Sequence, residues 1–255
     1  YKAAEKNGKI LTVGFQTRYN PELQAAKKFV ESGFLGKAYY AEAAGGEAAA
    51  RRRGIPGNSF TKKETAGRGV TLDMGMYVLD SALYLLGHPN PVSVTGFTYA
   101  GIGRDETAAG AGDKTWGGTW DPERFEVEDF SAAFIRFEGD LTMVYKQAWA
   151  MHAETLGNPV LLGTKGGITL NPLTLYSDIN GHMINITPQH LSESQDLYDQ
   201  EFYKKIYDFA VAVRDGAKPP IDPKEIVKEQ FIVDAIYSSS ESKREMILNL
   251  PSDLK

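Results

Sequence analysis

The feature that most restricts the fold is a series of strand-like segments in the second half of the chain. They are rich in β-branched and aromatic residues, and in chain order they occupy 92–99, 127–153, 159–177 and 182–189. We expect two strands in 127–153, joined at Glu138-Gly139-Asp140, and two in 159–177, joined at Lys165-Gly166-Gly167. Consecutive hairpins of this kind predict a large, mostly antiparallel sheet.

Helical patterns stand before and after these strands. Residues 21–33 form an amphipathic pattern that begins at a proline and ends at a glycine, and 38–44 have the composition of one more strand. The chain returns to helix at 201–216 and 223–243. Helices that accompany a run of hairpins gather on one face of the sheet. We therefore predict an α+β fold, with a large open sheet and helices on one face.

The first residues follow a different pattern. Good helix formers precede Gly8, which stands where a helix C-cap glycine belongs. Residues 10–15, ILTVGF, form a short apolar run of the kind found in buried parallel strands. A helix that leads into a buried strand is half of a βαβ unit. We therefore expect the chain to be a fragment of a longer protein.

Charge and composition argue against several kinds of partner. The 255 residues carry a net charge of −5, and Arg51-Arg52-Arg53 suits a small anion site better than a nucleic-acid surface. No apolar run approaches the roughly 20 residues that span a membrane. Cysteine is absent, which removes disulfides and thiolate chemistry. We expect a cytoplasmic protein with neither a nucleic-acid nor a membrane partner.

One apolar helix pattern, GVTLDMGMYVLDSALYLLG at 69–87, contains acidic residues. At helical spacing its polar side chains share one face: Asp73, Tyr77, Asp80 and Tyr84. A buried aspartate is costly unless it is paired or used. Asp73 and Tyr77 together suit proton transfer or hydrogen bonding to a ligand. In the alternative interpretation Tyr77 packs and Asp73 is a charge favoured by the helix dipole. Asp80 is better explained as a structural residue paired with a neighbouring loop.

Other kinds of site lack their patterns. The four histidines are scattered, without the spacing of a metal site: His88, His152, His182 and His190. No GxSxG element predicts a serine nucleophile. The segment GIGRDE at 101–106 begins like a dinucleotide fingerprint but lacks its third glycine and a following helix. We therefore expect no metal site and no dinucleotide fingerprint in these residues.

Several segments together resemble a known family. AGRGVTLDMGMYVLD resembles the GGGxxxDxGxH segment of the Gfo/Idh/MocA family, the sugar and inositol dehydrogenases related to glucose–fructose oxidoreductase. ILTVGFQTRYNP resembles the last Rossmann strand of that family and the crossing into its second domain. Further matching segments follow in the same order: RRRGIPG, WGGTWDPERFEVEDF and LLGTKGGITLNPL. The resemblance covers essentially the whole chain.

The resemblance implies a domain organisation. Family members join an N-terminal Rossmann domain to a C-terminal α/β domain, whose sheet walls the substrate site and makes oligomer contacts. Residues 1–17 would be the remnant of the Rossmann domain, and 18–255 the substrate-binding and oligomerisation domain. The family's glycine-rich motif and its Glu-Lys-Pro motif would both lie upstream of Tyr1. We expect a homo-oligomer, a dimer or tetramer, that assembles through the sheet.

The resemblance also implies roles for individual residues. Tyr77 stands where most family members have the proton-transferring histidine, and tyrosine there is similar to the glucose–fructose oxidoreductase branch. Asp73 would bind sugar hydroxyls or orient Tyr77, so these two are the expected catalytic residues. The expected substrate-binding residues are Arg18, Tyr19, Arg53, Gly69 and Trp120. Gln16 and Arg18 are expected to contact the cofactor, and Arg68 interrupts the usual glycine run.

The activity implied is that of an NAD(P)-dependent oxidoreductase acting on a sugar, cyclitol or related polyol by hydride transfer. The cofactor would be NAD or NADP, and this chain, mainly the substrate domain, is expected to be inactive alone. An alternative is a non-catalytic carbohydrate-binding or assembly module of the same fold. A weaker alternative is a relative that uses NAD in elimination chemistry on glycosides.

Overall fold

A nine-stranded sheet forms the centre of the protein. The structure, a computed structural model, describes residues 1–45, 55–105, 120–189, 191 and 197–254. The strands are β1 (Ala38–Ala44), β2 (Pro91–Tyr99), β3 (Phe130–Phe137), β4 (Thr142–Ala148), β5 (Val160–Gly163), β6 (Gly166–Thr169), β7 (Thr174–Ile179), β8 (His182–Ile186) and β9 (Met246–Ile247). Their order across the sheet is β8-β7-β6-β5-β1-β4-β3-β2-β9. Within the described residues, β1 and β4 pair in parallel and every other neighbouring pair is antiparallel. The predicted open antiparallel sheet is confirmed.

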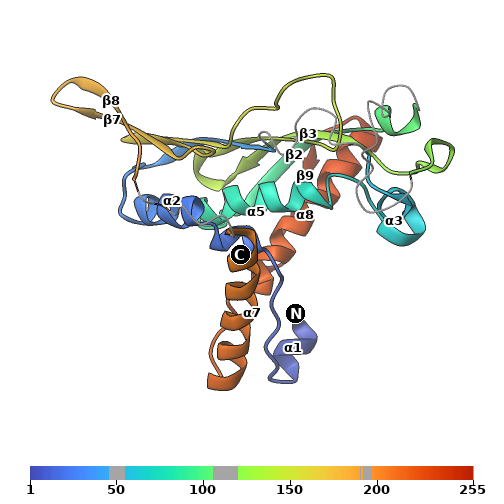
Figure 1. The fold of residues 1–255 in the computed structure, drawn as a ribbon, viewed down its shortest axis with the longest axis horizontal. Coiled ribbons are helices and arrows are strands. Elements are labelled where there is room, and N and C mark those ends of the chain that lie inside the picture. The colour runs from blue at the N-terminus through green and yellow to red at the C-terminus, as the bar shows by residue number, and fades with distance from the viewer. Residues whose placement is uncertain (46–54, 106–119, 190, 192–196, 255) are drawn as a thin grey trace.

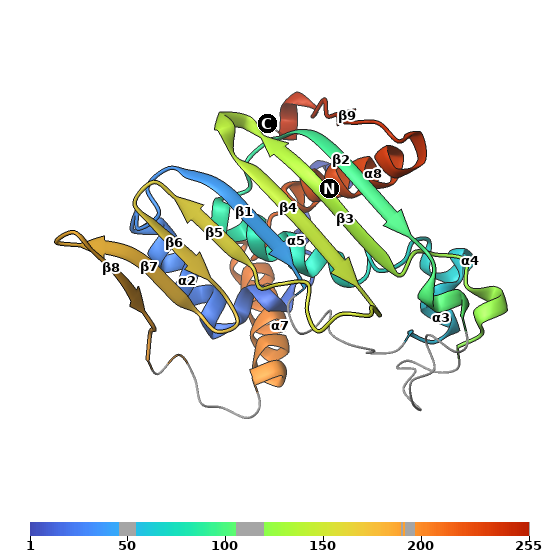
Figure 2. The same ribbon diagram turned by 90° about the horizontal axis from the view of Figure 1, so that it is seen from above.

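The helices cover one face of this sheet. Their bounds are α1 (Lys2–Lys6), α2 (Pro21–Glu31), α3 (Asn58–Thr61), α4 (Lys63–Ala66), α5 (Met74–Leu86), α7 (Leu197–Asp215) and α8 (Pro223–Ser242), with a 3₁₀ helix, η1, at Gln16–Tyr19. Figures 1 and 2 show α2, α5 and α8 on the same side of the sheet, while α7 extends away from the sheet beside α1. The predicted α+β class is therefore confirmed. None of the described helices is both long and apolar enough to cross a bilayer.

The main core lies between the sheet and the helices α5 and α8. Alternate residues of the central strands point into this core, as Met143 and Tyr145 do from β4. Helix α8 lies so close to β2 that a Cβ added at Gly96 would be 2.6 Å from the Cα of Ile236. A second apolar cluster joins α2 to β5, β6 and β7. The two clusters fix α2, α5 and α8 on the sheet.

Local signals fix the ends of the helices around η1. Asn20 accepts hydrogen bonds from the backbone N–H groups of Glu22 and Leu23, and Pro21 occupies the first position of α2. Helix α5 ends at Gly87, which adopts the left-handed conformation with φ 76°. Helix α7 packs against η1, which also contacts α2 and α5. The short η1 segment is therefore held by three helices.

The expected strand at residues 10–15 is not formed. A strand needs a neighbour for its backbone groups, and this segment joins no strand of the described sheet. It is held instead by the Thr12 hydroxyl, which donates to the Ile221 carbonyl and accepts from the Ile221 N–H. The segment therefore runs in extended form from α1 to η1.

A second correction concerns the hairpin at Lys165-Gly166-Gly167. Residues 159–177 contain three strands instead of two, because Gly166 and Gly167 begin β6 rather than forming the turn. The turn lies at Thr164-Lys165, between the paired residues Leu162 and Gly167. A Cβ at Gly166 would be 2.7 Å from the ring of Phe34. This glycine therefore allows close packing of Phe34 on the strand.

Candidate functional site

A cavity of about 490 Å³ lies beside the N-terminal half of α5. We name it the Tyr77 cavity. Its walls come from η1, the start of α2, the ends of β1 and β4, and α7. Its polar lining residues are Gln16, Thr17, Asn20, Glu22, Tyr77, Ser81, Gln147, Asn171 and Glu201. Its volume lies within the range of small-molecule sites, which combine apolar walls with a few directed polar groups.

Tyr77 lies one turn into α5. Its ring packs edge-on against Phe15, with ring centroids 5.3 Å apart, and its backbone carbonyl accepts a hydrogen bond from the Ser81 hydroxyl. In the part of the chain that the structure describes, the phenol itself makes no hydrogen bond. The ring is thus held by packing, while the hydroxyl is available to a ligand in the cavity.

Asp73 does not continue the helical stripe that the sequence predicts. Helix α5 begins at Met74, and Asp73 is its N-cap residue with a non-helical ψ of −84°. Asp73 accepts a hydrogen bond of 2.9 Å from the Trp149 indole, and it lines a separate cavity of about 250 Å³. Burial raises the pKa of Asp73, and the Trp149 hydrogen bond opposes this. Asp73 and Tyr77 therefore border different cavities.

Glu201 brings a carboxyl group to the Tyr77 cavity from α7. The Asn20 amide donates a hydrogen bond of 3.0 Å to one of its oxygens. Burial raises the pKa of Glu201, and the Asn20 bond opposes this. Nothing in the sequence pattern of α7 indicates that Glu201 meets Asn20, which lies 181 positions away.

The η1 wall of the Tyr77 cavity also carries polar atoms without partners. The Gln16 carbonyl oxygen Oε1 and the Thr17 hydroxyl are both buried and lack a hydrogen bond within the described residues. Gln16, which the family resemblance assigns to the cofactor, therefore lies in the same cavity as Tyr77. These atoms could be satisfied by the hydroxyl or amide groups of a ligand.

The other half of α5 borders a buried ion-pair cluster. Arg18 Nε lies 3.1 and 3.0 Å from the two Asp80 oxygens, and its Nη2 lies 2.6 Å from Oδ1. Arg18 Nη1 lies 2.8 Å from Glu225. Burial alone would lower the pKa of Arg18, but the hydrogen bonds to Asp80 and Glu225 outweigh it and raise that pKa. Asp80 is thus a paired structural residue, as the sequence indicated.

Two further titratable groups complete this Arg18 cluster. His88 Nε2 lies 3.2 Å from Arg18 Nη2. Burial, together with the positive charges of Arg18, Lys228 and Lys27, lowers the pKa of His88 to about 3, so the ring is neutral. Burial and the nearby Asp80 carboxylate raise the pKa of Glu229 well above its ordinary value. The cluster thus holds a neutral imidazole and a carboxyl group that keeps its proton to higher pH.

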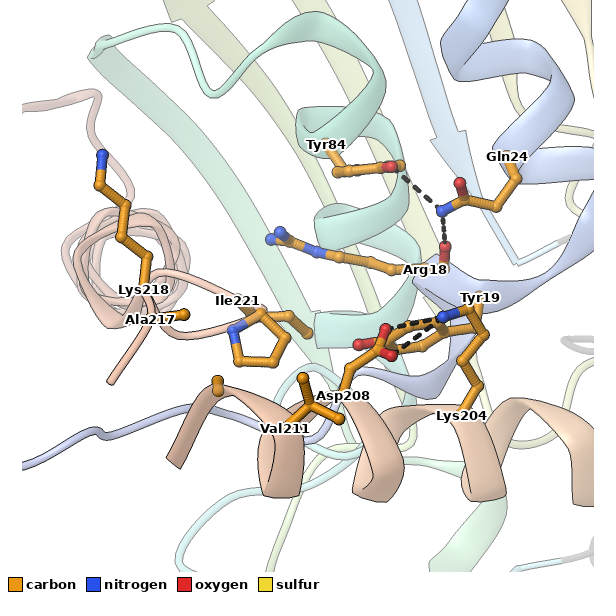
Figure 3. Close-up of a pocket in the computed structure, with 12 residues that line it drawn as sticks. Arg18, Tyr19, Gln24, Tyr84, Lys204, Asp208, Val211, Ala217, Lys218 and Ile221 are labelled. Atoms are coloured by element: carbon orange, nitrogen blue, oxygen red, sulfur yellow. Dashed lines mark hydrogen bonds and ion pairs between the residues drawn. The ribbon is translucent and has the colours of Figure 1, made fainter. Parts of the chain in front are cut away.

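A second cavity of about 460 Å³ lies beside the Arg18 cluster, between α5, α7 and residues 217–221 (Figure 3). Tyr19 lies in it, under the Lys204 ammonium at 5.6 Å from the ring centre. Burial and Asp208 raise the pKa of Tyr19 to about 12. Lys204 pairs with Asp208 at 2.9 Å. Arg18 and Tyr19, both expected to bind substrate, therefore border this cavity and not the Tyr77 cavity.

The remaining expected site residues have structural contacts. The Gly69 N–H donates to the Glu128 carboxylate at 3.1 Å, and a Cβ at Gly69 would lie 2.1 Å from the Glu128 carbonyl oxygen. Trp120 donates its indole N–H to the Gly103 carbonyl. Neither residue lines the Tyr77 cavity. Arg53 lies outside the described residues.

The described residues fit a polyhydroxylated ligand better than a dinucleotide. They contain no glycine-rich turn between a parallel strand and a helix that would cradle a pyrophosphate. No group of three histidine or acidic residues within them is placed to hold a metal ion. The Tyr77 cavity instead offers hydroxyl, amide and carboxyl groups, which suit sugar hydroxyls. The lining thus suits a ligand rich in hydroxyl groups, and no arrangement of the described residues fits the phosphates of NAD.

An open sheet with helices on one face defines an α+β domain, and the polar cavity beside α5 is its candidate small-ligand site. Residues 23–169 match the GFO/IDH/MocA C-terminal domain. This match covers more than half of the chain, and the chain belongs to the Gfo/Idh/MocA family. The resemblance seen in the sequence is therefore confirmed.

Known proteins resemble the chain over most of its length. D-glucoside 3-dehydrogenase of Escherichia coli K12 is 29% identical over 94% of this chain and 65% of its own length. A putative UDP-kanosamine synthase oxidoreductase subunit of Amycolatopsis mediterranei S699 is 30% identical over 59% of this chain and 40% of its own length. The chain thus spans less than two thirds of these relatives.

The solved structure of a levoglucosan dehydrogenase, a complex with NADH and levoglucosan, has the same fold. Its TM-score is 0.75 at 19% identity, and the match covers 97% of this chain and 68% of that one.

Proposed function

We propose that this chain is the substrate-binding and oligomerisation part of an NAD(P)-dependent oxidoreductase acting on a sugar, cyclitol or related polyol, with D-glucosides as the first candidates. The observation that carries this is the Tyr77 cavity, which is lined by buried polar atoms that have no hydrogen-bond partner in the described residues. Sugar hydroxyls both donate and accept hydrogen bonds and so match such a lining. The likeness to D-glucoside 3-dehydrogenase supports the choice of substrate.

Tyr77 would bind the hydroxyl on the reacting carbon and exchange a proton with it. Its phenol faces the cavity without a competing hydrogen bond from the described residues, while its ring is fixed against Phe15. Glu201 would bind another hydroxyl, since its carboxyl is held by Asn20 at the same cavity. Asp73 would act from the neighbouring cavity by orienting the sugar or the start of α5.

NAD or NADP would accept the hydride, and a separate dinucleotide-binding domain would carry it. A surface for such a domain is available on α7, where apolar side chains are exposed at helical spacing: Tyr203, Ile206, Tyr207 and Val213. Glu201 of the Tyr77 cavity lies on the same helix. A domain packed there would stand next to the site, in keeping with the proposed boundary between residues 1–17 and 18–255.

The open face of the sheet is the proposed oligomer surface. Phe97 and Tyr99 of β2 and Phe134 of β3 are exposed. They alternate with the residues that face α8, so they lie on the side away from the helices. Exposed aromatic residues grouped on a sheet suit a dimer or tetramer contact. The same face favours the second candidate function, a non-catalytic carbohydrate-binding or assembly module.

The test is NAD(P)⁺ reduction with methyl β-D-glucopyranoside, for the chain alone and for the chain joined to a dinucleotide-binding domain of a family member. The account predicts oxidation by the joined protein and none by the chain alone. Calorimetric titration with NADH and NADPH checks where the cofactor binds. Sugar binding without oxidation in either form would favour the non-catalytic module. Tight NADH binding by the chain alone would contradict the separate cofactor domain.

A further inference from the structure

Three large polar or aromatic side chains alternate along the end of β4 and the residue that follows it: Tyr145, Gln147 and Trp149. Tyr145 and Trp149 have partners: the Tyr145 oxygen accepts from Ser131, and the Trp149 indole donates to Asp73. Gln147 stands between them with 0% exposure, and neither its carboxamide oxygen nor its nitrogen has a hydrogen-bond partner within the described residues. Its polar neighbours on either side are satisfied, and Gln147 is not.

Folding alone gives no reason for glutamine at this position. A buried amide without partners destabilises the folded state, and buried polar side chains are nearly always hydrogen-bonded. A methionine of similar length would fill the same space without that penalty. A buried polar side chain without hydrogen bonds, next to polar side chains that have them, is typical of a residue that binds a ligand.

The position of Gln147 indicates which ligand it meets. Gln147 lines the Tyr77 cavity, together with Ala44, Gly45 and Met74. Its register partner on β3 is Ser131, whose hydroxyl donates its proton to Tyr145. Tyr77 borders the same cavity from α5, so one ligand could contact both residues once the Gln147 amide, which has no exposed surface in this structure, turns toward the cavity.

We propose that Gln147 is a specificity-determining residue, whose carboxamide binds two neighbouring hydroxyls of the sugar. Its NH₂ group donates to one hydroxyl and its oxygen accepts from the other, which uses both halves of the amide. This inference rests on the proposed function, because it takes the ligand of the Tyr77 cavity to be a polyol. A site built to hydrogen-bond a hydroxyl strongly rejects the analogue that lacks it, since the buried amide is then left unpaired.

The test uses the 255-residue chain and the Gln147→Met variant, titrated calorimetrically with methyl β-D-glucopyranoside and with its monodeoxy analogues. We expect Gln147→Met to bind the glucoside about tenfold more weakly or worse, from the loss of two neutral hydrogen bonds. The wild type should lose a similar factor for the analogue that lacks a contacted hydroxyl, while Gln147→Met should no longer discriminate. Gln189→Met, at an exposed glutamine, is the control and should bind as the wild type does.

Thermal unfolding provides the second measurement. Removing an unpaired amide should raise the Tm of Gln147→Met by about 2–4 °C, the shift expected for about 1 kcal/mol in a chain of this size. A Gln147→Leu variant guards against a packing defect specific to methionine. If both variants melt below the wild type, Gln147 supports the fold and the inference is wrong.

The two proposals fail separately. If the wild type binds the glucoside and Gln147→Met binds it equally well, the role of Gln147 is contradicted while the proposed function stands. If the wild type binds neither the glucoside nor any of the analogues, the proposed function fails and the inference fails with it.

Discussion

The polar residues beside the two halves of α5 differ in their hydrogen bonding. In the C-terminal half, Asp80 is fully buried and holds Arg18 by two of its nitrogens. Beside the N-terminal half, Tyr77 and Gln147 of β4 line one cavity, and neither the Tyr77 hydroxyl nor the Gln147 amide has a hydrogen-bond partner in the described residues. The C-terminal half borders a closed ion-pair cluster, and the N-terminal half borders the cavity that we propose as the ligand site.

Cavity size does not distinguish the two halves. The cavity beside the Arg18 cluster measures about 460 Å³ and the Tyr77 cavity about 490 Å³. The difference lies in hydrogen bonding, because polar groups in the first are paired with one another, as Lys204 is with Asp208 and Gln24 with Tyr84 (Figure 3). Of the two linings, only that of the Tyr77 cavity contains buried polar atoms without a hydrogen-bond partner among the described residues.

The largest expected effect comes from removing the cation of the Arg18 cluster. Arg18→Met leaves Asp80 buried without its cation, which should cost about 3–5 kcal/mol of unfolding free energy. Urea unfolding measures it. Arg136→Met is the matched control, since Arg136 pairs with Glu245 at 3.8 Å on the surface and should lose about 0–1 kcal/mol. Equal losses in the two variants would show that the Arg18 cluster does not stabilise the fold.

Acid should lower the free energy of unfolding through His88, which lies in the Arg18 cluster. The folded protein keeps this ring neutral down to about pH 3, whereas the unfolded chain takes up a proton near 6.5. Protons therefore favour the unfolded state, and stability falls as pH falls from about 6.5 towards 3, by at most about 1.4 kcal/mol per pH unit. His88→Gln should lose less stability on acidification. Urea unfolding between pH 4 and 7.5 checks this, with exposed His182→Gln as the control. Parallel pH profiles for wild type and His88→Gln would contradict the assignment.

Gly75, in the first turn of α5, allows the start of the helix to pack closely on β4. A Cβ there would lie 1.9 Å from the Tyr145 hydroxyl oxygen and 3.1 Å from the Val70 carbonyl oxygen. Gly75→Ala should therefore cost about 1–3 kcal/mol by overpacking. Adding Tyr145→Phe removes the closest atom and should recover part of that loss, as a double-mutant cycle of unfolding free energies would show. Strict additivity would mean that the contact is not the cause.

The smallest effect on stability is expected in the N-terminal half of α5, at Tyr77. Tyr77→Phe removes a hydroxyl without a partner in the described residues, so unfolding free energy should change by no more than about 0.5 kcal/mol. Glucoside binding by the same variant should weaken. Tyr84→Phe is the matched control in the C-terminal half: it loses the Gln24 hydrogen bond, about 1 kcal/mol, and should leave sugar binding unchanged. Unaltered glucoside binding by Tyr77→Phe would remove Tyr77 from the site.

Sequence patterns predicted the sheet because alternation and turn residues are local signals. The strand expected at 38–44 matches β1, and the turn expected at Glu138-Gly139-Asp140 joins β3 to β4. The strand expected at 10–15 was wrong because pairing depends on a neighbour that the local sequence does not show. Asp73 does not continue the expected stripe, because helix α5 begins one residue after it and the backbone of Asp73 is not helical.

The site was predicted less completely. Spacing identified Tyr77, which does line a cavity. Gln147 carried a weak signal, a polar residue in the inward alternation of β4 after Met143 and Tyr145. Glu201 carried none, because its place in the cavity depends on how α7 packs on η1. Arg18 was expected to bind substrate, but an arginine's partners are set by distant residues, here Asp80 and Glu225.

The most direct test of the account is a crystal structure of the chain soaked with methyl β-D-glucopyranoside. The account predicts one sugar in the Tyr77 cavity, with a hydroxyl on the Tyr77 phenol and two neighbouring hydroxyls on the Gln147 amide. A sugar bound instead beside Arg18 and Tyr19 would show that the cavity at the C-terminal half of α5 is the site. It would contradict the assignment of the Tyr77 cavity as the ligand site and of the Arg18 cluster as structural.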